Sequence, residues 1–162
     1  MSPLNCPYGN DTNKIMTTLE MTDLKTRVAN WTQTYADAIT ENYRRYHLNM
    51  LTREGHPYPE YAKEQLDEIE NGTANLMYFT INNGKKYYKI VQMEFDTFQN
   101  RNEYREGSVH AFVNKETGQV YKPASWNRPA KHVRYDMRII KEREFLFNPN
   151  NTSWAGGYLY MR

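Results

Sequence analysis

Residues 108–138 read SVHAFVNKETGQVYKPASWNRPAKHVRYDMR, and this stretch is the most informative for the fold. Apolar side chains alternate with others over 109–114, which predicts a β-strand. The connection 114–118 fits a type I turn closed by a left-handed Gly118, so the next residues should return as the second strand of a hairpin. Pro123 should end the pairing, because proline has no N–H to donate to a neighbouring strand.

A second hairpin is predicted ahead of this one. Residues 76–82 and 85–95 are rich in β-favouring side chains and change the hydrophobic period to two. They flank Asn83-Gly84, a dipeptide typical of tight hairpin turns. The polar, uneven residues 96–107 are expected to form a loop between the two hairpins.

The residues after Pro129 also show a period of two. The alternation over 132–139 predicts a strand. Residues 141–147 could either continue this strand or form a helix. Asn, Pro and Gly make 148–157 a loop, and 158–161 is expected to be a short closing strand.

Two helices are expected before the strands. Apolar residues recur at three- and four-residue steps over 23–51, with Thr22 as a reasonable N-cap. A second helix is predicted over 59–71, with proline in its first turn and Gly72 at its C-terminal cap. This second helix carries five carboxylates against one lysine.

Helices followed by strands indicate an α+β fold. We expect two N-terminal helices packed on an antiparallel sheet of about five to six strands built from hairpins. The polar residues 1–21 are predicted to be a flexible arm, and 22–162 a single domain.

Composition restricts the possible functions. The chain has 162 residues, a net charge of +2, 14% aromatic residues and one cysteine, Cys6, which cannot form an internal disulfide. It shows neither a secretion signal nor an apolar run of membrane-spanning length, so we expect a reducing cytoplasm and no membrane contact.

No catalytic, cofactor-binding or metal-binding signature stands out. The four histidines lack partners at metal-ligand spacing, and neither a nucleophile elbow nor a phosphate-binding glycine loop is present. We therefore expect no cofactor, no metal and no catalytic residue. The alternative is a small hydrolase or transferase in which His110 and His132 meet across the sheet.

The basic loop around Trp126 is the better candidate site. Cations can neutralise a phosphate, while an indole offers a stacking face to a base. The predicted ligand-binding residues are Lys122, Trp126, Arg128, Lys131, His132, Arg134 and Arg138. Alternatively, Arg134, Asp136 and Arg138 form a surface ion-pair ladder, and Trp126 fills the core.

The same region resembles a known family. Residues 109–113 (VHAFV), Thr117-Gly118, 122–126 (KPASW) and 129–131 (PAK), with Arg134, resemble a small family of uncharacterised tailed-phage proteins. The resemblance covers about 30 residues. It implies a phage setting and expression in the host bacterial cytoplasm, and it supplies no activity or site residues.

Three functions remain open. The first is a non-enzymatic module that binds a nucleotide, such as a host defence signal, or single-stranded nucleic acid. The second is a virion component or host-protein inhibitor that works as a homo-oligomer, since its helical face and its opposed acidic and basic segments could pair between subunits. The third is the His-dependent hydrolase.

Overall fold

The structure is a computed structural model that describes the backbone of residues 9–160 and the side chains of residues 23–160. Its elements are α1 (Gly9–Thr52), α2 (Pro59–Asn71), β1 (Tyr78–Asn83), β2 (Tyr87–Asp96), η2 (Phe98–Asn100), β3 (Glu103–Asn114), β4 (Gln119–Tyr121), β5 (Tyr135–Asp136), α3 (Ile140–Phe147) and η3 (Gly157–Leu159). The predicted α+β fold, with two N-terminal helices and an antiparallel sheet, is confirmed.

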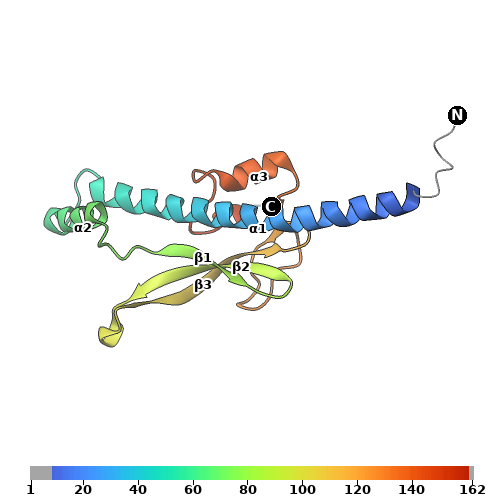
Figure 1. Cartoon of the computed structure of the whole chain (residues 1–162). Coiled ribbons are helices and arrows are strands. Elements are labelled where there is room, and N and C mark those ends of the chain that lie inside the picture. The colour runs from blue at the N-terminus through green and yellow to red at the C-terminus, as the bar shows by residue number, and fades with distance from the viewer. Residues whose placement is uncertain (1–8, 161–162) are drawn as a thin grey trace.

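The sheet has five strands in the order β1-β2-β3-β4-β5, and every neighbouring pair is antiparallel. Strands adjacent in the sequence are therefore adjacent in the sheet, which is the usual arrangement for consecutive strands. Helix α1 lies across one face of the sheet, and α3 lies on the other side of α1 (Figure 1).

The core forms where α1 meets the sheet. Val28, Tyr35 and Ile39 follow one face of α1 and have no exposed surface. They pack with side chains that β2, β3, β4 and the C-terminal segment supply, including Ile90, Ala111, Val113, Val120, Met137, Leu146 and Leu159. Each such apolar side chain contributes roughly 1.5–3 kcal/mol when it is fully buried, so this helix–sheet contact dominates the stability of the fold.

Helix α1 begins earlier than the sequence pattern predicts. It starts at Gly9 rather than at Asp23, so the proposed N-cap at Thr22 is wrong. Residues 10–22 contain neither glycine nor proline, and their Asn and Thr residues only lower helix propensity without breaking a helix. Part of the predicted arm, 1–8, lies outside the described residues.

Helix α2 follows the prediction at both ends. Pro59 occupies the first turn, and Gly72 adopts the left-handed conformation at φ 74°. The Gly72 N–H donates to the carbonyl of Ile69 at 3.2 Å, which closes the helix with a glycine cap.

The turn between β1 and β2 lies two residues later than predicted. Asn83 pairs with Tyr88, and the Gly84 N–H donates to the Tyr87 carbonyl at 3.1 Å. The two residues at the turn are therefore Lys85 and Lys86, and Asn83-Gly84 belongs to the paired segment.

The predicted loop 96–107 is much shorter in the structure. β3 begins at Glu103 and pairs with β2 out to Asp96, so only residues 97–102 connect the strands. Three of them, Gln99, Asn100 and Asn102, have positive φ. Asparagine tolerates the left-handed region, which allows the chain to reverse within so few residues.

The strand predicted over 132–139 is mostly wrong. Only Tyr135 and Asp136 pair as β5, and residues 140–147 form α3. Asp136 ends the strand, because its Oδ1 accepts the backbone N–H of Arg138 and its carbonyl accepts that of Ile139. The predicted closing strand 158–161 is also wrong over its described residues, since Gly157–Leu159 form η3.

Candidate ligand-binding site

Aromatic rings and a lysine gather on the sheet face that points away from α1. Partners in an antiparallel sheet project to the same face, so Lys89 shares a face with Phe112, and Phe112 shares it with Tyr121. The Tyr87 ring lies 5.9 Å from the Phe112 ring and 5.9 Å from the Tyr121 ring, edge to face in both pairs. We call Tyr87, Lys89, Phe112, Tyr121 and Trp126 the outer-face cluster.

The loop that carries Trp126 is closed by its own backbone. Residues Pro123 and Pro129 face each other as an isolated bridge, and the Ala130 N–H donates to the Lys122 carbonyl at 2.8 Å. The backbone N–H groups of Ala124 and Ser125 both donate hydrogen bonds to the Arg128 carbonyl. Trp126 therefore sits at the tip of a short, hydrogen-bonded loop.

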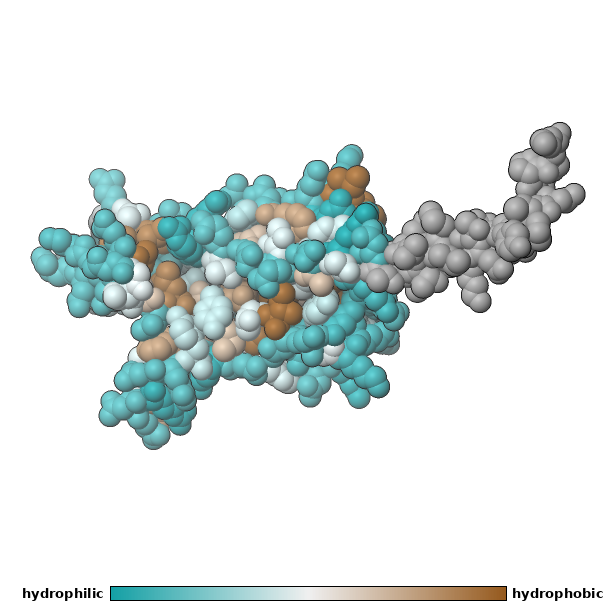
Figure 2. Space-filling view, viewed as in Figure 1, coloured by the Kyte–Doolittle hydropathy of each residue, from teal (hydrophilic) through white to brown (hydrophobic). Residues whose placement is uncertain are grey.

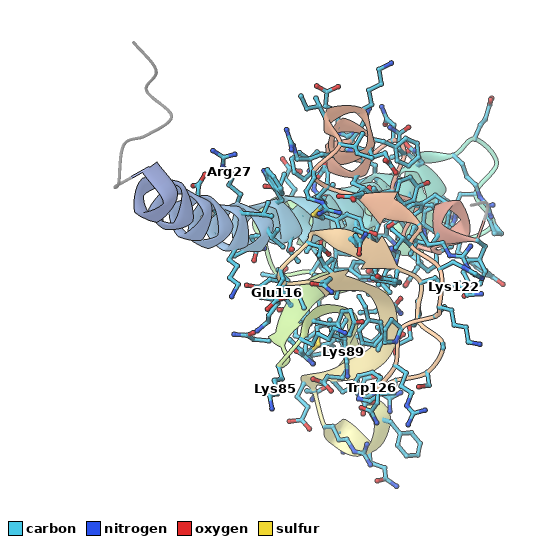
Figure 3. The ribbon with its side chains drawn as sticks, turned by 90° about the vertical axis from the view of Figure 1, so that its right-hand side faces the viewer. Arg27, Lys85, Lys89, Glu116, Lys122 and Trp126 are labelled. Carbon is cyan, nitrogen blue, oxygen red and sulfur yellow. The ribbon has the colours of Figure 1, made fainter. Side chains whose placement is uncertain are left out.

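The Trp126 indole is accessible and meets a lysine that the sequence analysis did not identify. Trp126 is 38% exposed, so the alternative in which it fills the core is wrong. The Lys89 ammonium lies 4.6 Å from its ring centroid and 5.8 Å from that of Phe112. Such contacts are favourable cation–π interactions. Figure 3 shows Lys89 and Trp126 close together.

The predicted cations do not converge on one hollow. The Lys122 ammonium lies 4.3 Å from the Tyr160 ring centroid, and Arg138 binds Asp136 through Nε and Nη2. This Asp136–Arg138 pair confirms one part of the alternative ion-pair ladder. Arg134 is half-buried, and its Nε is buried without a hydrogen-bond partner among the described residues.

Three other predicted site residues, Arg128, Lys131 and His132, are exposed on the loop. Trp126 and Lys122 are thus the two predicted residues that the structure places beside an aromatic or hollowed surface.

Two adjoining hollows run along β3 beside this loop. The first, of about 330 Å³, is lined by Gly107, Ser108, Val109, Pro123, Ala124, Ser125 and Trp126. The second, of about 380 Å³, is lined by Gln92, Ser108, Val109, His110, Pro123, Trp154, Ala155, Gly156 and Tyr160. They share Ser108, Val109 and Pro123, so they form one trough from Trp126 to Tyr160, beside which Lys122 lies.

His110 lines the trough because β3 bulges at this position. Ile90 pairs with Ala111 while Val91 pairs with Val109, which leaves His110 without a partner on β2. A bulge turns the extra residue out of strict alternation. The His110 side chain is therefore buried, only 8% exposed, and packs on the Phe79 ring.

A buried hydrogen-bond chain holds this histidine. His110 Nε2 and the Tyr158 hydroxyl are 2.7 Å apart, and the Tyr158 and Tyr35 hydroxyls are 2.5 Å apart. Burial lowers the pKa of His110 to about 4, although a hydrogen bond with the Trp154 backbone acts in the opposite direction. His110 is neutral at pH 7, and its Nε2 is already hydrogen-bonded to Tyr158.

The two histidines of the hydrolase hypothesis occupy different environments. His110 is buried at the base of the trough, whereas His132 is exposed and does not line it. The activity itself remains a prediction without a structural argument for it.

The sequence analysis missed Tyr87, Lys89, Tyr121 and Tyr160. A signal existed for the first two, because the period of two in β2 places Tyr87 and Lys89 on the face opposite to the buried Ile90. Their relation to Trp126 depends on how the later loop folds back over the sheet, which periodicity does not show.

Within residues 23–160, no cluster of three or more His, Cys, Asp or Glu side chains could hold a metal ion. The helices of the described chain also include none with the length and apolarity needed to span a bilayer.

Comparison with known proteins identifies the family of the chain. Neither the curated proteins nor the solved structures gave a match. Residues 13–161 match a family of unknown function, DUF7717. This match covers both the outer-face cluster and the trough, and the chain belongs to that family.

Proposed function

We propose that this protein is a non-enzymatic binding module for an anionic ligand that contains a base, either a nucleotide or single-stranded nucleic acid. The observation that carries the proposal is the Trp126 indole, which is 38% exposed, lines the trough and lies 4.6 Å from the Lys89 ammonium. A base would stack on the indole, and the lysines would bind phosphate.

The chemistry of the surface supports such a ligand. Aromatic faces accept any base, and each stacked base contributes about 1–3 kcal/mol to binding. Lys89 and Lys122 already contact aromatic rings, so their positions are partly fixed before a ligand arrives. Less side-chain entropy is then lost on binding.

The proposal fits the setting that the resemblance to tailed-phage proteins implies. In a host bacterial cytoplasm, a small phage protein with this surface would capture a nucleotide defence signal or bind exposed single strands. The family match is to a family of unknown function and assigns no activity, so the phage setting depends on the resemblance alone.

The test has two titrations of the purified protein at low salt. Binding of a fluorescein-labelled oligothymidine is measured by fluorescence anisotropy, and binding of a panel of mono- and cyclic nucleotides is measured by calorimetry. Trp126→Ala and Lys89→Ala should weaken binding about tenfold or more, which corresponds to the loss of one stacked base or one phosphate contact. Lys63→Ala removes an exposed lysine from α2 and is the matched control.

Salt distinguishes the two ligands. Affinity for a long strand should fall steeply with salt because many counterions are released, whereas affinity for a small nucleotide should fall little. Absence of saturable binding to every probe at low salt would refute the proposal.

A second function is favoured by a different observation. The carboxylates Glu60, Glu64, Asp67 and Glu70 are exposed on α2, which lies at one end of α1 (Figure 1). Figure 2 shows a largely hydrophilic surface over that end of the molecule. An exposed acidic helix suits an electrostatic contact with another protein or another subunit. A monomer in sedimentation at low salt, together with absence from purified virions, would count against this structural role.

A further inference from the structure

A second cationic hollow lies away from Trp126, on the side of the sheet that faces α1. It has a volume of about 340 Å³ and is lined by Lys25, Lys85, Lys86, Tyr88, Lys115 and Glu116. We call it the lysine hollow. It shares no residue with the trough, so it requires a separate explanation.

Three elements bring these lysines together. Lys25 comes from α1, Lys85 and Lys86 form the β1–β2 turn, and Lys115 lies in the β3–β4 turn. The two turns are joined directly, because the Lys115 N–H donates to the Lys86 carbonyl at 3.1 Å.

The β3–β4 turn is also packed against α1. A Cβ at Gly118 would lie 3.2 Å from Val28 Cγ2, which shows how closely the turn approaches the helix. The backbone around the hollow is therefore fixed by contacts that do not involve the lysine side chains.

The charge in the hollow is unbalanced. Four lysines and one glutamate line it, which gives the lining residues a net charge of +3. The Lys86 ammonium lies 5.5 Å from the ring centroid of Tyr87, on the outer face of the sheet, so Lys25, Lys85 and Lys115 are the lysines on which the site depends. Glu116 lies 4.0 Å from Lys25, and both are more than half exposed. Lys85 and Lys86 form no ion pair with any side chain of residues 23–160.

The most buried lysine of the four is held in place. Lys115 is half-buried, its ammonium donates to Asn83 Oδ1, and it lies 4.9 Å from the Tyr88 ring centroid. Figure 3 shows Lys85 and Glu116 on the same side of α1, whereas Arg27 points to the other side. Arg27 is paired with Asp23 at 2.7 Å.

Protection of an edge strand does not explain this arrangement. Lysines often block the free edge of a sheet, and β1 is an edge strand. That role could apply to Lys85 and Lys86. It does not apply to Lys25, which is on a helix, or to Lys115, which follows the inner strand β3.

We propose that the lysine hollow binds a compact multivalent phosphate, such as pyrophosphate or the polyphosphate group of a larger molecule. Like charges that line one hollow repel one another, and a multivalent anion would reduce that repulsion while accepting several charge-assisted hydrogen bonds. The site goes beyond the proposed function, because it does not depend on stacking against Trp126.

The experiment is calorimetric titration with pyrophosphate, with orthophosphate and sulfate at matched ionic strength for comparison. Saturable binding of pyrophosphate, stronger than that of the other two anions, is expected. Lys85→Ala and Lys115→Ala should each lower the affinity about tenfold, as the loss of one charge-assisted hydrogen bond predicts. Lys85 is exposed at a turn, so Lys85→Ala should fold normally even if Lys115→Ala does not.

Controls separate this site from the first one. Trp126→Ala and Lys63→Ala should bind pyrophosphate as the unmodified protein does. Loss of pyrophosphate binding in Trp126→Ala would place the anion at the outer-face cluster and overturn the inference, as would unchanged binding in Lys85→Ala. A salt-sensitive oligomer that Lys85→Glu disrupts would show that the hollow holds the acidic α2 of a second copy, which also overturns it.

Discussion

Acidification between about pH 7 and about pH 5 should destabilise this protein through His110. Burial holds the pKa of His110 at about 4 in the folded protein, against 6.5 for the free side chain. In the interval between these values, the unfolded chain binds a proton that the folded protein does not. The free energy of unfolding therefore increases with pH across this interval and decreases as the pH is lowered.

The magnitude follows from the two pKa values. The maximal slope is about 1.4 kcal/mol per pH unit, and the full difference in pKa corresponds to about 3 kcal/mol. Between about pH 7 and about pH 5 the expected loss is about 2 kcal/mol. For a chain of this size the melting temperature should fall by roughly 4–8 °C.

Asp96 and Asp136 contribute little in this interval. The Phe98 backbone N–H bound to Asp96 holds the pKa of that carboxyl below 3.8. Burial acts to raise the pKa of Asp136, but the hydrogen bonds and charge of Arg138 together outweigh it, so this pKa also lies below 3.8. The stability that these carboxylates provide is therefore present above about pH 4 and is lost only at lower pH. Burial also lowers the pKa of His47, so His47 adds a smaller effect in the same direction.

The assay is urea unfolding at a series of pH values for the unmodified protein, His110→Gln and His47→Gln. Glutamine keeps a polar group near Nε2 and does not titrate, so His110→Gln should lose most of the pH dependence between about pH 6.5 and about pH 4.5. His47→Gln should retain it. Equal slopes for the unmodified protein and His110→Gln would show that His110 is not buried as a neutral side chain.

Three further predictions concern single side chains. Tyr158→Phe removes a hydroxyl bonded to both His110 and Tyr35, and should lower the free energy of urea unfolding by about 1–3 kcal/mol. Gly118→Ala should lower the free energy of unfolding by at least ~1 kcal/mol, because φ is +73° and the new methyl would lie close to Val28 and Met137. Gly55→Ala should lower it less, because φ is also positive, at +72°, but the methyl would enter open space. Lys89→Ala should change the tryptophan fluorescence spectrum, because the ammonium beside Trp126 is lost.

The elements that the sequence predicts well are those with local signals at their ends. Pro59 and Gly72 predict the first residue and the C-terminal cap of α2 correctly, and the turn that ends at Gly118 predicts the β3–β4 hairpin. In each case one residue type has a conformational preference that few others satisfy. At these positions the conformation that the residue prefers locally is also the one that the folded chain requires.

The errors occur where distant contacts override local preference. Asn83-Gly84 is a favourable hairpin turn by itself. In the observed register, however, Lys85 and Lys86 form the turn and Asn83 pairs with Tyr88, whose side chain packs against the core. The strand predicted over 132–139 requires Val133 and Ile139 to face inward, yet they are 41% and 50% exposed. Tertiary packing decided both outcomes.

The near-neutral charge of the whole chain conceals the property on which both proposals rest. Helix α2 carries five carboxylates and one lysine, which give it a net charge of −4. Because the whole chain has a net charge of +2, the residues outside α2 have a net charge of +6. Helix α2 lies at one end of α1, whereas the β1–β2 turn with its lysines points toward the other end (Figure 1). Exposed charges farther apart than about 10 Å are largely screened at 0.1 M salt. An anion that approaches the lysine hollow would therefore encounter its local field, with little influence from the acidic helix.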